Sequence, residues 1–180
     1  YNRSPDAGVD DRGAFVHLKD SEISFAGRHN LIAGGFNSAD DYSIDHLITE
    51  NMHIVNAGDT GAKIYTQNYI DKGSLFHGDT IGVHFYAKNQ LSLTENITMI
   101  SSRVEGGQTD CMLKIDSCLA GKFVNVFSPG HSGNTPATQV KIGTDATENV
   151  AGTGTAFNVG QLTFDSCINQ TATTGYDLVA

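Results

Sequence analysis

Three carboxylates could perform acid–base chemistry in this chain, and they are Asp71, Glu95 and Asp116. Asp71 and Asp116 each follow the first residue of a short apolar segment, where strand alternation would turn the side chain towards solvent. If these segments stack with one other strand between them, the two carboxylates lie roughly 10 Å apart. Inverting glycosidases hold their carboxyl pair about 6.5–9.5 Å apart to admit a water molecule. The spacing predicts a general acid and a general base, and Glu95, between them, could pair with either aspartate.

A second group combines cation-capable and aromatic side chains. Lys63 and Tyr65 match His84 and Tyr86 in a neighbouring segment with the same spacing. Sugars pack their C–H faces on aromatic rings while their hydroxyl groups form hydrogen bonds, so these four residues are candidates for substrate binding. Tyrosine is also enriched in subunit interfaces, which is the alternative for Tyr65 and Tyr86. For the carboxylates, the alternative is that they only keep a strand surface hydrated.

The sequence contains no indication of a metal or another cofactor. The seven histidines lack the spacing of known metal-binding motifs. The three cysteines, Cys111, Cys118 and Cys167, have no Cys-x-x-Cys spacing and are an odd number. We expect them to be buried thiols in a strand-rich core.

These residues belong to segments that repeat along the chain. Ile48–Val55 resembles Leu93–Ile100, with Thr-Glu-Asn identical in both, and Gly61–Asn68 resembles Gly82–Asn89. A series of leading apolar residues recurs at a roughly constant interval of about 22 residues. Its members are Ile48, Ile70, Leu93 and Ile115, with Phe164 about two intervals further on. Repeats of this length cannot bury their own apolar face, so successive copies must stack.

Each repeat contains short runs of alternating apolar and polar residues, which is typical of half-buried strands. Stacking would place equivalent strands in parallel register, about 4.8 Å apart. The sequence therefore predicts an all-β parallel β-helix over residues 14–180, after an irregular lead-in at residues 1–13. Asn51 and Asn96 are expected at a sharp left-handed bend between strands, with Gly73, Cys118 and Cys167 in the same position of other coils.

Composition excludes several classes of protein. The 180 residues include 20 glycines, only 17% are charged, and the net charge is −9. Strong helix formers are scarce, no apolar run approaches the length of a membrane-spanning helix, and an acidic chain without basic clusters is a poor partner for nucleic acid. We therefore expect neither nucleic-acid binding nor membrane insertion.

The repeat pattern resembles the pectin-lyase-like right-handed β-helices, and most closely the tailspikes of bacteriophages. Asp6-Ala7-Gly8-Val9-Asp10-Asp11 is similar to the Asp-Gly-Val-x-Asp-Asp phrase that often opens such domains, although its spacing is altered and the usual helical segment does not follow. The resemblance implies a right-handed helix in a homotrimeric, virion-attached, extracellular protein that binds and often cleaves bacterial surface polysaccharide. Because whole tailspikes are longer, we expect this chain to be one segment of such a protein.

Two classes of function follow from these observations. The first is a polysaccharide depolymerase, with a glycoside hydrolase favoured over a lyase because Lys and Arg are scattered singly. The second is a non-enzymatic module that binds glycan or only forms trimer contacts. A bacterial adhesin passenger segment would share the same architecture.

Overall fold

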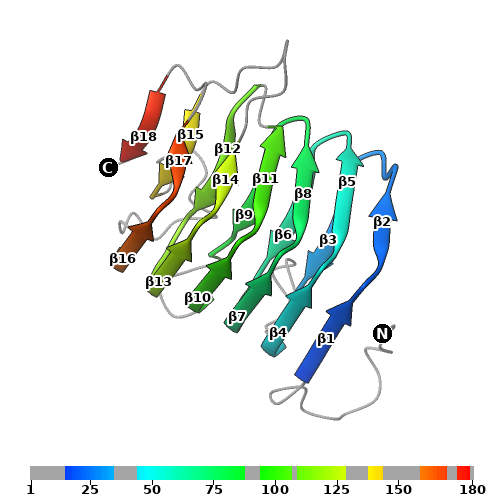
Figure 1. The fold of residues 1–180 in the computed structure, drawn as a ribbon, viewed down its shortest axis with the longest axis horizontal. Helices are drawn as coiled ribbons and strands as arrows, with labels where there is room; N and C mark the ends of the chain where they lie inside the picture. Colours follow the sequence, from blue (N-terminus) through cyan, green and yellow to red (C-terminus); the bar gives the residue numbers. More distant parts are fainter. Residues whose placement is uncertain are drawn as a thin grey trace, which may run out of the picture.

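Three parallel β-sheets form the protein, and each successive strand of the chain enters a different sheet (Figure 1). The structure is a computed structural model that describes residues 15–34, 44–87, 94–106, 109–128, 138–143, 159–169 and 174–178. All strand pairs in these residues are parallel, and the described elements include no helix. The predicted all-β parallel architecture is confirmed.

The first sheet has the strand order β1 (Phe15–Lys19), β4 (Ile44–Glu50), β7 (Thr66–Lys72), β10 (Thr94–Ile100), β13 (Cys118–Val124) and β16 (Val159–Asp165). The second contains β2 (Glu22–Ser24), β5 (His53–Ala57), β8 (Leu75–Gly78), β11 (Arg103–Gly106), β14 (Phe127–Ser128) and β17 (Ile168–Asn169). The third contains β3 (His29–Ala33), β6 (Thr60–Ile64), β9 (Ile81–Phe85), β12 (Cys111–Ile115), β15 (Thr138–Ile142) and β18 (Thr174–Leu178).

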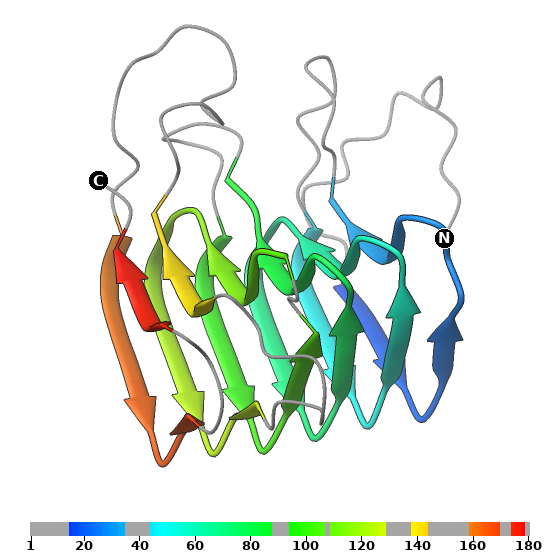
Figure 2. The ribbon, with the colours of Figure 1, turned by 90° about the horizontal axis from the view of Figure 1, so that it is seen from above.

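Each coil therefore contributes one strand to each sheet, and the next coil stacks on it. Figure 2 shows the strands of each sheet side by side, with β1 at one end of the stack and β16 at the other. Residues on equivalent strands of successive coils therefore lie next to one another, because neighbouring strands of a parallel sheet are about 4.8 Å apart.

The register confirms part of the predicted repeat and corrects the rest. Ile48 pairs with Ile70, one predicted interval later, as expected. Ile70 then pairs with Thr98, which lies beyond the expected position because the coil that begins with β7 is longer. Leu93 lies outside the described residues, and Ile115 belongs to β12 of the third sheet. The predicted alignment of the Ile48 and Leu93 segments was therefore in the wrong register.

A left-handed turn follows every strand of the first sheet. The residues with positive φ there are Asp20 (50°), Asn51 (53°), Gly73 (70°), Ser101 (54°), Asn125 (54°) and Ser166 (55°). The predicted bend is confirmed for Asn51 and Gly73. It is wrong for Asn96, which lies within β10 and donates a hydrogen bond to Asn68 Oδ1 at 2.9 Å.

The two cysteines predicted at this bend are also displaced from it. Cys118 begins β13, and Cys167 comes directly after the left-handed residue Ser166. All three cysteines are free; Cys111 and Cys118 are buried, as predicted, whereas Cys167 is partly exposed. Burial raises the pKa of the Cys118 thiol to about 11, so it remains protonated at neutral pH.

The core is a column of apolar side chains enclosed by the three sheets. Aromatic rings contact one another through its centre: Tyr69 lies 5.3 Å from Phe85 of the same coil, and Phe85 lies 6.5 Å from Phe123, two coils further on. Phe123 stacks on Phe164 with 4.7 Å between the ring centroids. Contacts within this column stabilise the stacking of the coils. They also keep in place the strands that carry the outward-facing side chains.

Candidate functional site on the third sheet

A row of cation-capable side chains crosses the third sheet. Lys63 on β6, His84 on β9, Lys114 on β12 and Lys141 on β15 occupy one register position, and we call them the cation row. The predicted match of Lys63 with His84 is confirmed. Lys114 and Lys141 were missed because they follow at longer intervals than the predicted repeat suggested.

A second row comes immediately after these strands. The backbone nitrogen of Tyr65 donates to the oxygen of Ala33 at 2.8 Å, that of Tyr86 to Ile64 at 2.8 Å, and that of Asp116 to Phe85 at 3.0 Å. Tyr65, Tyr86 and Asp116 therefore hold the same place on three successive coils. Their alignment brings together two predicted aromatic residues and one predicted catalytic carboxylate.

His84 and Asp116 form a buried pair. The Nε2 atom of His84 lies 2.9 Å from Oδ2 of Asp116, and the two side chains are 9% and 3% exposed. The same carboxylate oxygen accepts a hydrogen bond from the backbone nitrogen of Ala87 at 3.3 Å. The other oxygen, Oδ1, is buried without a hydrogen-bond partner among the described residues. A buried acceptor of this kind is costly in free energy unless a donor reaches it.

Tyr86 connects the two rows. Lys63 Nζ lies 4.4 Å from the centroid of the Tyr86 ring, which is a cation–π contact. The His84 ring meets the same ring edge-on, with centroids 5.7 Å apart and an interplanar angle of 84°. Lys63 and Tyr86 are partly exposed, whereas His84 is buried, so the aromatic ring and the ammonium group form the accessible side of this cluster.

Tyr65 differs from Tyr86 in exposure. Only 4% of Tyr65 is exposed, although it occupies the equivalent place one coil earlier. The prediction of two outward-facing stacked tyrosines is therefore wrong for Tyr65, which packs into the structure. Strand alternation alone could not show this, because Tyr65 follows the last residue of β6 and lies where the chain turns into β7.

The far end of the cation row is also paired with an acid. Lys141 Nζ lies 3.5 Å from Oδ1 of Asp110, with both side chains partly exposed. Lys114 is almost completely buried, at 1% exposure. The row thus combines buried and partly exposed cations with two carboxylates, a mixture that can bind the hydroxyl and charged groups of a polar ligand.

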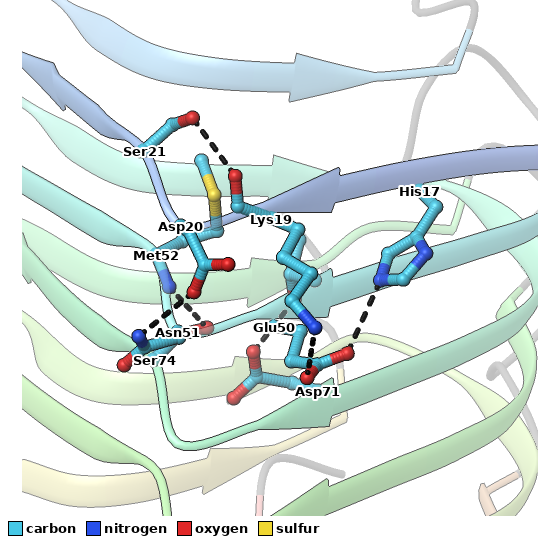
Figure 3. A network of polar contacts seen from close by, with 10 residues as sticks. His17, Lys19, Asp20, Ser21, Glu50, Asn51, Met52, Asp71 and Ser74 are labelled. Carbon is cyan, nitrogen blue, oxygen red and sulfur yellow. Dashed lines mark hydrogen bonds and ion pairs between the residues drawn. The ribbon is translucent and has the colours of Figure 1, made fainter.

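Asp71 lies on a different sheet from this cluster, and its predicted exposure is wrong. It is fully buried on β7 of the first sheet. Thr49 Oγ1 donates to Asp71 Oδ1 at 2.6 Å, and Ser102 Oγ donates to Asp71 Oδ2. Ser74 donates to Asp71 as well, and Figure 3 shows the two side by side near Met52. Asp71 therefore joins three coils from inside.

The interior position of Asp71 has a simple cause. In β7, residues Tyr69 and Asp71 both face the core, so the residue after Ile70 points inwards and Ile70 itself points outwards. The prediction assigned the opposite parity. Burial raises the pKa of the Asp71 carboxyl group, while the hydrogen bonds from Ser102, Ser74 and Thr49 oppose that rise.

The burial of Asp71 predicts a pH-dependent stability. Because the folded-state pKa is higher than the unfolded-state value of about 3.9, this group's contribution to the free energy of unfolding is complete below that value. The contribution is lost as pH rises through the folded-state pKa. Asp71→Asn should therefore become more stable relative to the original chain as pH rises from acid to neutral. Urea unfolding at several pH values measures the difference, with Asp79→Asn, at an exposed position, as the control. A pH dependence of Asp71→Asn that runs parallel to that of the original chain contradicts the expectation.

Glu95 is not brought to either aspartate. It lies near the start of β10 and is partly exposed, whereas Asp116 is buried after the last residue of β12. Among the described residues, no hydrogen bond joins Glu95 to Asp71 or Asp116. The predicted set of three catalytic carboxylates is therefore dispersed over two sheets.

Charged side chains on the outer side of the first sheet pair with one another at the N-terminal coils. Glu50 lies between Lys19, at 2.9 Å, and His17, at 3.3 Å (Figure 3). Hydrogen bonding to Lys19 holds the pKa of Glu50 below its ordinary value. Asn51 donates to Asp20 at the adjoining bend. These exposed pairs link neighbouring coils, and exposed pairs of this kind contribute little to stability.

Comparisons with known proteins add no relative: no family model, no curated protein and no solved structure matches the chain. Within the described ranges, no three His, Cys, Asp or Glu side chains gather in a way that could hold a metal ion. None of the described segments forms a helix that is long and apolar enough to span a membrane.

Proposed function

We propose that the chain is a glycan-binding segment of a right-handed parallel β-helix of the bacteriophage tailspike type. Its ligand in this proposal is bacterial surface polysaccharide, a capsule or an O-antigen. The protein acts outside the cell as part of the virion tail. The pairing of Ile48 with Ile70 agrees with the predicted interval for one coil. The three stacked parallel sheets are compatible with this class of protein.

One observation carries the proposal. Lys63, His84, Tyr86 and Asp116 come from successive coils and are joined by a cation–π contact, an edge-on ring contact and a hydrogen bond. An aromatic ring beside charged donors and acceptors is suited to a sugar, which has C–H faces for the ring and hydroxyl groups for the polar atoms. A solenoid also offers a long face along which a polymer can lie.

A homotrimer is part of the same proposal. Three large apolar side chains of the first sheet are exposed: Phe15 at 63%, Ile100 at 37% and Leu119 at 58%. Burial of such side chains in subunit contacts is favourable. Sedimentation equilibrium should give three times the monomer mass, and a monomer at all concentrations would remove the trimer from the proposal without affecting glycan binding.

The binding proposal is tested with a panel of purified capsular and O-antigen polysaccharides on the intact chain. Tyr86→Ala should weaken binding about tenfold or more, which corresponds to about 1.4 kcal/mol. Phe25→Ala is the matched control, since Phe25 is an exposed aromatic residue (79%) outside the site. Circular dichroism confirms that both variants fold. The proposal fails if no polysaccharide binds, or if the two variants bind equally well; a structural module or an adhesin segment then becomes the better interpretation.

Cleavage of the polysaccharide is a second candidate, favoured by the buried His84–Asp116 pair. Asp116 is the one predicted catalytic carboxylate in the cluster, and a His–Asp pair can transfer protons. We expect Asp116→Asn to abolish turnover while the ligand still binds. Reducing-end release indicates hydrolysis, and ultraviolet absorption of an unsaturated product indicates elimination. Binding without either product limits the protein to recognition.

A further inference from the structure

We propose that the polysaccharide bound on the third sheet carries carboxylate groups, so that the site is specific for an acidic sugar. This inference rests on the proposed glycan binding and adds the charge of the ligand. It begins from the cation row, where three lysines and one histidine share a single register position on four adjacent strands.

The concentration of positive charge in this row is unusual for this chain. The protein has 11 Lys and Arg against 20 Asp and Glu, with a net charge of −9. Three of the lysines nevertheless align on one sheet face: Lys63, Lys114 and Lys141. Like charges directly opposite one another on neighbouring strands destabilise a sheet. Asp116 beside His84 and Asp110 beside Lys141 offset part of this repulsion, and an anionic ligand along the partly exposed residues of the row would offset more of it.

Burial increases the effect of these charges. Lys114 is only 1% exposed, so water screens its charge poorly. Lys63 and Lys141, at the two ends, are partly exposed and can reach a ligand directly. With adjacent strands about 4.8 Å apart, the ends of the row are roughly 14 Å from each other. That length suits a run of sugar units along the sheet better than a single small anion.

The neighbouring groups favour a sugar acid over a simple anion. Tyr86 offers a ring face or edge beside Lys63, and Asp110 and Asp116 offer carboxylate oxygens next to the cations. Carboxylates repel a bare anion but accept hydrogen bonds from sugar hydroxyl groups. The combination of cations, acceptors and an aromatic ring matches a ligand that has carboxylates, hydroxyl groups and C–H surface together.

The test uses the same panel of bacterial polysaccharides, chosen so that some contain uronic or sialic acids and others are neutral. Each polymer that binds is compared with its carboxyl-reduced form on the intact chain. We expect the reduced polymer to bind about tenfold more weakly, and we expect binding of the native polymer to fall as salt is added.

Two lysine variants test whether the acidic polymer binds at the cation row. Lys63→Gln should weaken binding of the acidic polymer about tenfold and leave binding of its reduced form nearly unchanged. Lys122→Gln is the matched control, because Lys122 is exposed on β13 of the first sheet and the charge change is identical. Thermal unfolding confirms that both variants fold.

The outcomes separate the two proposals. If only neutral polymers bind, or if carboxyl reduction and Lys63→Gln have no effect, specificity for acidic sugars is overturned while glycan binding stands. If equal losses occur with Lys63→Gln and Lys122→Gln, the cation row is not the site. If no polymer of either kind binds, glycan binding itself fails.

Discussion

Phe123→Ala should lower the free energy of unfolding by about 3–5 kcal/mol, the usual cost of removing a buried phenylalanine. Phe123 is completely buried on β13 and lies between two other rings. Its ring stacks on Phe164 at 4.7 Å with an interplanar angle of 10°, and it lies 6.5 Å from Phe85. The substitution therefore removes ring contacts with the following coil and with a coil two positions earlier.

The effect should be strongest at one end of the solenoid. In a stacked repeat protein, stability is approximately the sum of the coils and their nearest-neighbour interfaces. Loss of the Phe123–Phe164 stack weakens the interface between β13 and β16, so amide hydrogens of β16 should exchange faster than those of β4.

Urea unfolding and hydrogen exchange measure these effects, and Phe15→Ala is the control. Phe15 is 63% exposed on β1, so its loss should cost about 1 kcal/mol or less. Similar losses for both variants, or unchanged exchange in β16, contradict the proposed role of the ring column.

Gly106→Ala should lower the free energy of unfolding by at least as much as Phe123→Ala, because two independent features oppose a side chain at this position. Gly106 has φ of +91°, a region that residues with a side chain rarely adopt. An added Cβ would also lie 2.0 Å from the backbone oxygen of Gly78 on the adjacent coil. Backbone atoms cannot rotate away as a flexible side chain can, so β8 and β11 would have to separate. We expect a loss of several kcal/mol or no folded protein.

Gly73→Ala separates the clash from the backbone strain. Gly73 also has positive φ, +70°, but an added Cβ meets nothing within 4 Å. We therefore expect a cost of about 1 kcal/mol. Gly73→Asn should cost less still, because Asn51 occupies the equivalent bend with φ of 53°.

Soluble yield and thermal unfolding of the three glycine variants give the comparison. The close-approach argument requires Gly106→Ala to be much the worst of them. A well-folded Gly106→Ala with stability near that of Gly73→Ala would contradict it.

The sequence predicted the general architecture well because strand repetition is a local property. Alternating residues and bends rich in Asn, Gly, Asp and Ser can be read from short windows, and a repeat of the predicted length cannot form its own core. The match of Lys63 with His84 and of Ile48 with Ile70 followed directly from that period.

Prediction failed where coil length changed. The step from Ile70 to Thr98 is longer than the predicted period, so a fixed period shifted the expected position of Asn96 from a strand to a bend. Lys114 and Lys141 were missed for the same reason. Insertions between strands alter the register without altering the pattern within each strand.

For the candidate site too, the sequence predicted some features and only the tertiary structure decided others. The residue types that could bind a sugar, such as Lys63 and Tyr86, were recognisable from composition and spacing. Whether a carboxylate faced water or the core depended on its exact strand position, and a single-residue error in parity reversed the result for Asp71.

The amino-acid sequence by itself therefore determined that this chain is built of short parallel strands in stacked coils. Only the tertiary structure decided that Asp116 pairs with His84 beside Tyr86 and that Asp71 is held inside by Thr49 and Ser102. The physical reason is that strand character depends on neighbouring residues, whereas contacts between coils depend on the length of every intervening turn.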